Sequence, residues 1–541
     1  MVERMRQVIA SPLVVALWVL MIPWGFEVYF SAFVRESELN SRLGWALAIA
    51  AVAWLSRSRL LTGLLLLPFL LTGLADIFYA YYFGGVFSTN TLDAVFNTDV
   101  QETRELIQAY VNVESVLIIT FYVGGFVWLL RQMQPVGVWH WPKRIATGLG
   151  VMVLLFAVQQ MVGKQRFYDI LPGLLGIAPT YANNREHFAQ AVADYRHLVE
   201  TTELSARLRH QDVPQTRVII IGEAMTRTHM SLYGYPRKTT PVLDDLRSEL
   251  VVMTDVITPF VQTRPALNAM LFPQSWEQPE LDYHRALSIA NVARKAGYKV
   301  FWLSNQQPFR IPTQMIADTV DEAVFITREV AGVQAHRYDG RLLSHLARVL
   351  RDPAAHKLII VHLMGSHLQY ANRYPPEFDH FAGTPPRMIS QRLLSWQVDK
   401  INEYDNSLLY TDWLVGQIHQ QLRQYGQGAV GWMLFSDHGE EVYETAKLNG
   451  HTPDNLTRPM FTIPVIFWHN AVLRRQLGSS LAQLQANAPW PYLADRLFET
   501  WVDWLDLDWV DCAGCQYSFL RPYTPRLRKV YGFDYDERWS P

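Results

Sequence analysis

Glu223, Asp437 and His438 have side chains of the kinds that bind metal ions, and all three come at the ends of apolar runs. Glu223 follows TRVIII (216–221) and a glycine, and Asp437 and His438 follow VGWMLFS (430–436). Two carboxylates and one imidazole suit Zn²⁺ and leave room for a further ligand. Each residue alone is more typical of a capping carboxylate or a packed histidine. Together, at matched strand ends where the chain turns, they predict a metal site.

Thr263 is the candidate nucleophile. It lies in TPFVQTRPALNAML (258–271), where helical periodicity begins directly after Thr263 and places Pro265 in the first turn. This pattern predicts that Thr263 is the N-cap of a helix. A helix N-terminus presents free N–H groups to a phosphoryl group, and a zinc-bound hydroxyl there becomes a usable nucleophile. A threonine before x-Pro is also an ordinary helix start, so the spacing alone leaves the catalytic role open.

Two further histidines have small neighbours and fall in predicted loops. His367 ends the sequence GSH and His451 ends NGH. Such histidines can bind a phosphate, donate a proton to a leaving group or hold a second metal. His362 lies inside an apolar run instead, which predicts a buried, hydrogen-bonded side chain.

Four apolar runs end in polar residues of this kind and alternate with helical patterns. The other two are KVFWLS (299–304), followed by Asn305-Gln306-Gln307, and KLIIVHLM (357–364), followed by Gly365-Ser366-His367. The alternation predicts an α/β domain with a mainly parallel central sheet. Ligands bind at the carboxyl ends of strands in such sheets, so the four strand ends predict one shared site.

The first 163 residues differ from the rest, because apolar runs dominate them. Segments 9–33, 43–55, 60–82, 114–130 and 145–163 are candidates to cross a bilayer, which takes about 20 apolar residues as a helix. The second segment is short and needs its flanks. Five such runs argue against buried hairpins of a soluble domain. The first run lacks a small-residue cleavage site, so we interpret it as an anchor. Residues 1–163 are therefore predicted to be a five-span transmembrane domain.

The placement of Lys and Arg orients these spans. Three groups fall on one side: Arg4 and Arg6; Arg57 and Arg59; and Arg131, Lys143 and Arg144. By the positive-inside rule the N-terminus is cytoplasmic, and an odd number of spans places residues 164–541 outside. We expect linker and membrane-surface helices over 164–213 and the catalytic domain over 214–541.

Charge and cysteine content narrow the class further. The 48 Lys+Arg nearly balance the 50 Asp+Glu, which argues against a broad nucleic-acid surface. The only cysteines, Cys512 and Cys515, form a C-x-x-C, for which a short structural disulfide is the expected state in an oxidising compartment. A zinc ribbon would need a second pair, and no thioredoxin-like context supports a redox motif.

Longer motifs resemble a known family. GEAMTRTHMSLYGYPRKTTPVLD, LSNQQ, IIVHLMGSH…RYP, EYDNSLLYTDWLV and FSDHGEEVY…GH are similar to the bacterial phosphoethanolamine transferases, and in particular to their CptA-like branch, which modifies the lipopolysaccharide core. The resemblance implies five membrane helices followed by an alkaline-phosphatase/sulfatase-like domain. It also implies that Glu223, Asp437 and His438 bind catalytic zinc, with Thr263 as fourth ligand and phosphorylated nucleophile.

The resemblance further implies a set of substrate contacts. These are His367, His451, Asn305 and Glu440 in the outer domain, and Thr98 and Glu102 in the loop between spans three and four. This chain has Ala224 where many members have Ser, and only one disulfide can form. Arg310 is the nearest cation where lipid A-modifying members carry a Lys. These departures favour the core-sugar branch.

The implied reaction is ping-pong transfer of phosphoethanolamine from phosphatidylethanolamine to lipopolysaccharide, on the core sugar or lipid A. We expect a monomer in the bacterial inner membrane with its catalytic domain in the periplasm. One alternative is a phosphoglycerol transferase using Mn and phosphatidylglycerol, and another is a catalytically inactive envelope scaffold. A sulfatase would need Cys or Ser followed by x-Pro-x-Arg, whereas Thr263 begins Thr-Arg-Pro-Ala-Leu.

Overall fold

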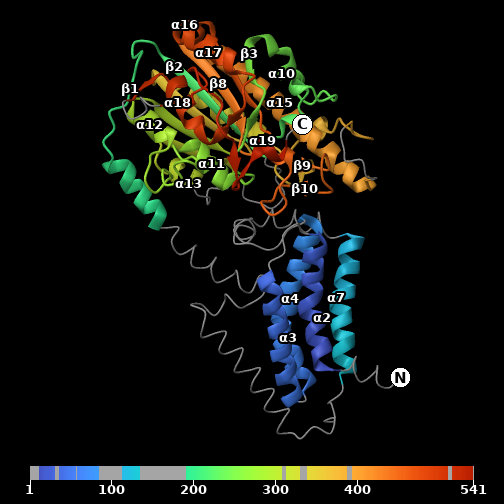
Figure 1. The fold of residues 1–541 in the computed structure, drawn as a ribbon. Helices are drawn as coiled ribbons and strands as arrows, with labels where there is room; N and C mark the ends of the chain where they lie inside the picture. The colour runs from blue at the N-terminus through green and yellow to red at the C-terminus, as the bar shows by residue number, and fades with distance from the viewer. Residues whose placement is uncertain are drawn as a thin grey trace. The chain divides into compact units, whose positions relative to one another are not determined.

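The structure, a computed structural model, forms two compact units, Met1–Phe188 and Ala189–Pro541 (Figure 1). It describes residues 11–30, 36–56, 58–83, 112–133, 190–306, 312–328, 338–386, 393–509 and 515–539. The predicted span 145–163 and residues Thr98, Glu102, Arg310 and Cys512 lie outside the described residues. Cys515 is disulfide-bonded.

The first unit consists, in its described part, of four helices: α2 (Pro12–Phe30), α3 (Glu36–Ser56), α4 (Arg59–Phe83) and α7 (Val113–Gln132). They coincide with the first four predicted spans. Three of them, over 12–30, 59–82 and 113–132, are long and apolar enough to cross a membrane, whereas α3 has only the shorter apolar stretch Arg42–Ala53. The described residues thus support three spans by length and composition, and the count of five stays a prediction.

A buried charge cluster joins three of these helices. Arg42 of α3 is 2% exposed and donates to Glu27 of α2 at 2.7 Å and to Asp76 of α4 at 3.3 Å. Charged side chains are costly in an apolar surrounding unless they are paired. Because they are paired, these three charged side chains can be buried between apolar helices.

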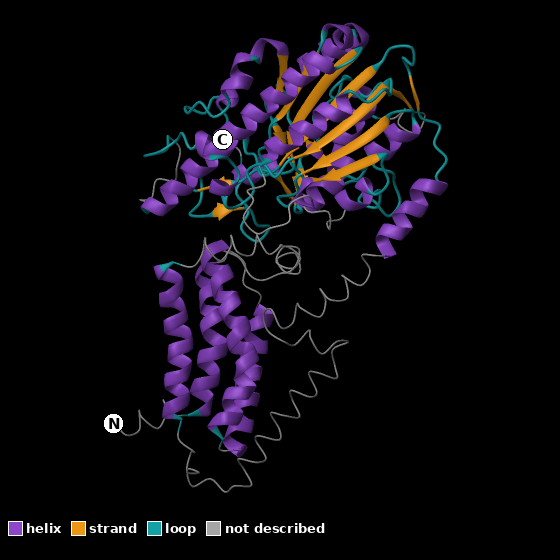
Figure 2. Ribbon diagram, turned by 180° about the vertical axis from the view of Figure 1, so that it is seen from behind, coloured by secondary structure: helices purple, strands orange, loops and turns teal. Residues whose placement is uncertain are grey.

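The second unit contains a seven-stranded sheet with helices on both faces (Figure 2). In spatial order its strands are β3 (Leu250–Met253), β11 (Val465–His469), β8 (Ala429–Ser436), β2 (Gln215–Gly222), β7 (His356–His362), β5 (Lys299–Ser304) and β6 (Glu322–Phe325). The strands from β8 to β6 are parallel, while β11 runs antiparallel to both of its neighbours. The sheet is therefore mixed, with the predicted parallel arrangement confined to one continuous block of five strands.

Side-chain alternation along the strands builds a separate core on each face. In β2, Ile219 and Ile221 point into one cluster and Val218 and Ile220 into the other, because successive residues of a strand face opposite sides. The first face is covered by α11 (Thr263–Leu271), α12 (Ile289–Lys295) and α18 (Leu497–Trp504). The second is covered by α14 (Leu342–Leu350) and the long α15 (Ser395–Tyr425).

Short elements complete the unit. The two-residue strands are β1 (Arg207–Leu208), β4 (Val256–Ile257), β9 (Glu441–Val442), β10 (Asn449–Gly450), β12 (Tyr492–Leu493), β13 (Leu507–Asp508), β14 (Lys529–Val530) and β15 (Phe533–Asp534). The short helices are α10 (Pro241–Asp245), α13 (Thr313–Ala317), α16 (Ala471–Leu477), α17 (Ser479–Asn487) and α19 (Tyr535–Arg538).

Part of the predicted linker belongs to this second unit. Residues 190–201 are helical, and Tyr195 on this helix is buried in the core of the first face. Its hydroxyl donates to Asn291 at 2.6 Å and accepts the N–H of Ser288 at 3.0 Å. Further along, β1 pairs with β13. From residue 190 onward the chain therefore packs as part of the sheet domain.

Candidate active site

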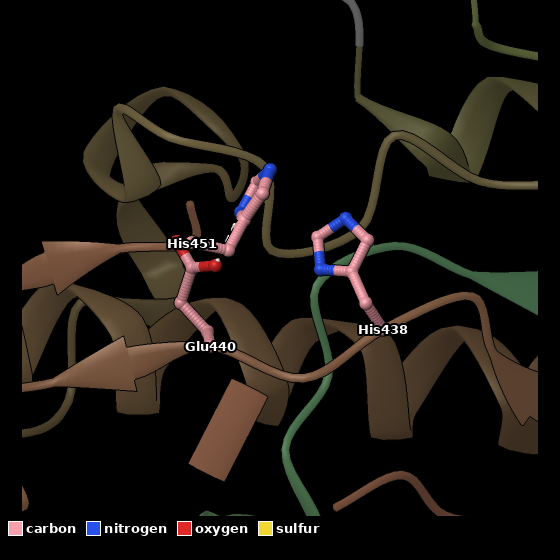
Figure 3. Close-up of side chains that lie close together, drawn as sticks. All are labelled: His438, Glu440 and His451. Carbon is pink, nitrogen blue, oxygen red and sulfur yellow. Dashed lines mark hydrogen bonds and ion pairs between the residues drawn. The ribbon is translucent and has the colours of Figure 1, made fainter. Parts of the chain in front are cut away.

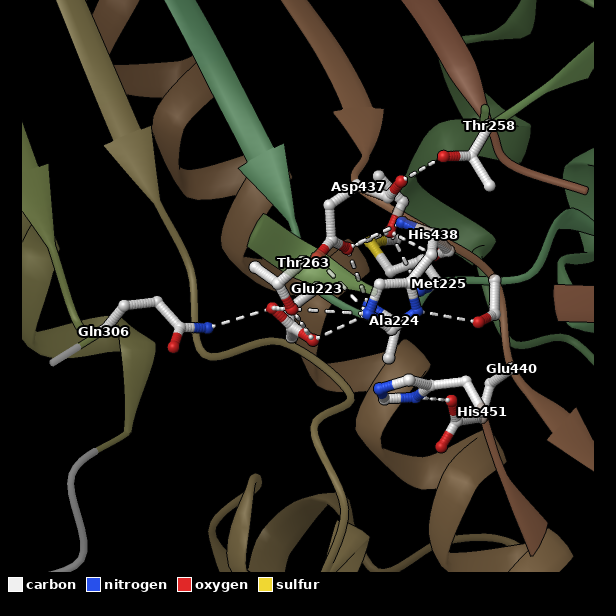
Figure 4. Close-up of polar contacts among 12 residues, drawn as sticks. Glu223, Ala224, Met225, Thr258, Thr263, Gln306, Asp437, His438, Glu440 and His451 are labelled. Carbon is white, nitrogen blue, oxygen red and sulfur yellow. Dashed lines mark hydrogen bonds and ion pairs between the residues drawn. The ribbon is translucent and has the colours of Figure 1, made fainter. Parts of the chain in front are cut away.

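Neighbouring strands bring the three candidate ligands together. Gly222 at the end of β2 is paired with Ser436 at the end of β8, and Asp437 N–H donates to the Gly222 carbonyl at 3.2 Å. Glu223, Asp437 and His438 follow directly and are all 0% exposed (Figure 4). In-register parallel strands thus place the predicted ligands at one edge of the sheet, as expected from the strand ends.

Thr263 joins this group from the first turn of α11. Its Oγ1 lies 3.4 Å from both carboxylate oxygens of Glu223 and 3.4 Å from Nε2 of His438. The prediction that Thr263 is the N-cap was wrong by one residue: the helix starts at Thr263, and Gln262 before it has the extended backbone of an N-cap (φ −129°, ψ 139°). The hydroxyl still lies at the helix N-terminus, because Thr263 is the first residue of α11 and Gln262 takes the N-cap position.

The spacing of these side-chain atoms fits a tetrahedral zinc ion. Nε2 of His438 is 3.3 Å from Oε1 of Glu223 and 3.4 Å from Oδ2 of Asp437. Tetrahedral zinc ligands at about 2.0–2.1 Å from the ion are separated from one another by about 3.3–3.4 Å. Oδ2 of Asp437 is buried and has no hydrogen-bond partner within the described residues. Zn²⁺ would supply the interaction that this oxygen otherwise lacks.

Neighbouring groups orient two of the ligands. Oδ1 of Asp437 accepts N–H groups from Ala224 at 3.1 Å and His438 at 2.8 Å, which leaves Oδ2 facing the other ligands. Nδ1 of His438 lies 2.8 Å from the Gly439 carbonyl. That carbonyl can only accept, so the contact assigns a proton to Nδ1 and leaves Nε2 as the atom that could bind a metal.

Gln306 orients the third ligand and was not assigned a role from the sequence. Its side-chain N–H₂ donates to Oε2 of Glu223 at 3.2 Å and to the Leu363 carbonyl at 3.0 Å. The preceding residue, Asn305, was the predicted substrate contact. Asn305 is fully buried and donates instead to Asp339 at 2.9 Å, which in turn accepts the N–H of Gly365. The end of β5 thus reaches Glu223 through Gln306, and the role of Asn305 as a substrate contact stays a prediction.

The buried charges of the group act on one another. Burial and the nearby Glu223 raise the pKa of Asp437 to about 6. Burial alone would lower the pKa of His438, but the carboxylates of Asp437 and Glu223 outweigh it and raise the pKa to about 10. That pKa puts a second proton on Nε2, and a bound cation would take the place of this proton, because two carboxylates in a buried site favour a positive charge.

The backbone around Glu223 is tightly constrained. Ala224 has a left-handed conformation (φ 56°), which is uncommon for a residue with a side chain. Gly365 (φ +51°) lies against the same turn, and a Cβ there would come within 2.9 Å of the Glu223 backbone nitrogen and oxygen. The left-handed backbone of Ala224 and the close approach of Gly365 together fix the position of Glu223.

A second polar group adjoins the first (Figure 3). Glu440 precedes β9 and His451 follows β10, and the pairing of these two strands brings the residues together. Nδ1 of His451 is 2.7 Å from Oε2 of Glu440, and the centroids of the His451 and His438 rings are 4.0 Å apart. His438, Glu440 and His451 each offer a ligand atom within 4.8 Å of the others. His451 is 22% exposed and is therefore the member accessible to a substrate.

The other two histidines singled out in the sequence, His367 and His362, differ in burial and in their neighbours. His367 is half-buried and follows Ser366, whose N–H donates to the Glu223 carbonyl at 3.0 Å. His362 is 2% exposed, with its Nδ1 3.5 Å from the hydroxyl of Ser304, in agreement with the prediction of a buried side chain.

The fold and the strand-end site are those of a known family. The Sulfatase family model matches residues 215–507, and the chain belongs to this family. It is homologous to phosphoethanolamine transferases, as its motifs indicated. It is 30% identical to phosphoethanolamine transferase EptC of Escherichia coli O18:K1:H7 (strain RS218 / NMEC), with 90% of this chain and 88% of EptC covered.

Two further comparisons agree. Phosphoethanolamine transferase CptA of Salmonella typhimurium is 28% identical, with 90% of this chain and 88% of CptA covered. The crystal structure of the C-terminal periplasmic domain of Escherichia coli EptC in complex with Zn is 32% identical, with a TM-score of 0.57, and covers 62% of this chain and 96% of that domain. The resemblance seen in the sequence is thereby confirmed.

Proposed function

We propose that this protein transfers phosphoethanolamine from phosphatidylethanolamine to lipopolysaccharide, on a core sugar or on lipid A, through a covalent intermediate on Thr263. The observation that carries the proposal is the position of the Thr263 hydroxyl, 3.4 Å from Glu223 and His438 at the start of α11. The homologous transferases EptC and CptA support the choice of transferred group.

Glu223, Asp437, His438 and Thr263 would hold the zinc ion. Bound zinc would lower the pKa of the Thr263 hydroxyl and stabilise charge on the phosphoryl oxygens. Gln306 keeps Glu223 in place through its hydrogen bond. The EptC domain structure in complex with Zn supports this choice of metal.

In the first half-reaction the Thr263 hydroxyl releases its proton to solvent, and its oxygen attacks the phosphorus of phosphatidylethanolamine. The bond from phosphorus to the diacylglycerol oxygen breaks, and diacylglycerol leaves with a proton. His451, held by Glu440 at 2.7 Å, lies beside the group and is suited to donate that proton. The N–H groups at the start of α11 stabilise the phosphorylated threonine.

In the second half-reaction an acceptor oxygen attacks the same phosphorus. The bond to Thr263 breaks, the threonine takes a proton from solvent to recover its hydroxyl, and the acceptor carries phosphoethanolamine. His451 is suited to remove the proton of the acceptor, the reverse of its first role. Thr263 is thus modified and regenerated in each cycle.

The membrane helices suit these substrates. Both donor and acceptor are anchored in lipid, and the first unit supplies helices able to span a bilayer. The sequence orientation and the periplasmic EptC domain favour an inner-membrane protein whose sheet domain lies in the periplasm.

Mass spectrometry of lipopolysaccharide from deletion and wild-type cells tests the proposal. Loss of phosphoethanolamine from the core or lipid A on deletion, and its return with the plasmid-borne gene, is the expected result. An unchanged spectrum would contradict the proposal. Loss of phosphoglycerol from an envelope glycan would instead identify a phosphoglycerol transferase.

A further inference from the structure

The turn that carries Glu223 obtains its hydrogen bonds from several elements. Backbone groups buried in such a turn must find partners, because an unpaired one costs free energy. The Glu223 carbonyl accepts from Ser366 N–H, and Met225 N–H donates to the hydroxyl of Ser436 at 2.9 Å. The carbonyl of Ala224 and the N–H of Thr226 also need partners, and both residues are buried.

One side chain, Tyr404 of α15, binds both of these groups. Its hydroxyl donates to the Ala224 carbonyl at 2.7 Å and accepts the N–H of Thr226 at 2.9 Å. Tyr404 is 0% exposed. Burial raises its pKa well above the usual value, so the phenol keeps the proton that it donates. The two bonds lie on either side of Met225, and one of them fixes the carbonyl of Ala224, the residue in the left-handed conformation.

A second residue of α15 supports the same turn through Ser366. Ser407 lies one turn of helix after Tyr404, so both face the site. The Ser407 hydroxyl donates to that of Ser366 at 2.8 Å, and Ser366 N–H donates to the Glu223 carbonyl. The helix therefore supports the turn directly through Tyr404 and indirectly through Ser407 and Ser366.

Tyr404 also packs against Tyr370, which supports the second polar group of the site. The edge of its ring packs on Tyr370, with centroids 5.0 Å apart at 76°. The Tyr370 hydroxyl donates to Oε1 of Glu440 at 2.7 Å, and the other oxygen of Glu440 holds His451. One buried ring thus adjoins the supports of both the metal ligands and the candidate proton donor.

We infer that Tyr404 is a positioning residue of the active site, which holds the Glu223–Thr226 turn in its left-handed form and so sets the geometry of the metal ligands. The inference rests on the proposed function, because it assigns Tyr404 an effect on zinc binding and turnover at that site. A phenylalanine at this position would keep the ring packing and remove both hydrogen bonds. The turn would then lose the partners that make its strained conformation favourable.

The test is the zinc affinity of the full-length Tyr404→Phe protein in detergent, measured by competition of Zn²⁺ with a chromogenic chelator. Changes beyond the direct metal ligands typically reduce metal affinity or activity by 10- to 100-fold. We expect about 10-fold weaker zinc binding and a comparable fall in kcat, with little change in KM. Saturating Zn²⁺ should restore part of kcat.

Tyr195→Phe is the matched control. Its hydroxyl is also buried and also makes one donated and one accepted hydrogen bond, but to Asn291 and Ser288 in the core of the opposite face. It should lower the melting temperature to a similar degree and leave zinc affinity and kcat unchanged.

Two results would overturn the inference. One is a Tyr404→Phe zinc affinity within twofold of wild type with kcat unchanged, and the other is an equal loss of affinity in Tyr195→Phe. If Tyr404→Phe does not fold, Ser407→Ala decides by the same criterion. Failure of wild-type protein to bind zinc or transfer phosphoethanolamine would instead refute the proposed function, so the two failures are distinct.

Discussion

Replacing Gln306 by leucine isolates the support of one metal ligand. Gln306 is 2% exposed, and its amide donates to Oε2 of Glu223 at 3.2 Å. Leucine has a similar volume and no donor, so the change removes the hydrogen bond and little packing. Glu223 keeps its position next to His438 but loses the contact that fixes its rotation.

The expected magnitude follows from the type of bond. A hydrogen bond to a charged group contributes about 1.5–3 kcal/mol, and about 1.4 kcal/mol corresponds to a factor of ten. Gln306→Leu should therefore reduce zinc affinity and kcat together by about 10- to 150-fold. Gln306→Glu should be worse, because it places a third carboxylate beside Glu223 and Asp437.

The assay combines zinc affinity with release of diacylglycerol from phosphatidylethanolamine in mixed micelles. Gln314→Leu is the control, because Gln314 donates to the carboxylate of Asp318, which is not among the metal-ligand candidates, and is 8% exposed. It should leave both measurements unchanged. Wild-type zinc affinity and kcat in Gln306→Leu would refute the reasoning that this hydrogen bond places the ligand.

Three further outcomes are expected. Gly365→Ala should lower the free energy of unfolding by about 1–3 kcal/mol and weaken zinc binding, because its left-handed backbone and the 2.9 Å approach to Glu223 exclude a Cβ; an unchanged melt would contradict this. Burial, with Arg217 and Arg474, lowers the pKa of His469 to about 3, and the neutral ring accepts Trp504 N–H through Nε2 at 3.0 Å. The free energy of unfolding should therefore fall as the pH drops from 6.5 towards 3, by up to about 1.4 kcal/mol per pH unit. His469→Gln should flatten this slope when unfolding is measured as a function of pH. Chelation of zinc should lower the melting temperature, because zinc at 100 times its Kd adds about 2.7 kcal/mol to the free energy of unfolding. Identical melting curves with and without EDTA would exclude a tightly bound ion.

The central arrangement of the site could be predicted from the sequence because it depends on one strong regularity. Apolar runs that end in Glu223, Asp437 and His438 had to be strands of a parallel block, and the carboxyl ends of such strands share an edge. In-register pairing of β2 and β8 then fixes the distance between these residues. The helix start at Thr263 was predictable to within one residue, since local periodicity sets helix positions only that closely.

The supports of the site were not predictable, because they depend on tertiary contacts. Whether Asn305 or Gln306 faces Glu223 is decided by the direction of one turn. Nothing in the sequence EYDNS indicates that Tyr404 binds a turn 180 residues earlier in the chain. The left-handed conformation of Ala224 could not be predicted either, because alanine has no preference for it. The same limit applies to the antiparallel β11, whose direction depends on the connection that precedes it.

The central claim is that Thr263 carries the phosphoethanolamine between donor and acceptor. Mass spectrometry of peptides from the full-length protein, quenched in acid after incubation with phosphatidylethanolamine and Zn²⁺ without acceptor, tests it most directly. We predict phosphoethanolamine on Thr263, its disappearance when acceptor is added, and none in Thr263→Ala. An unmodified Thr263 in protein that transfers the group, or transfer by Thr263→Ala at the wild-type rate, would contradict the account.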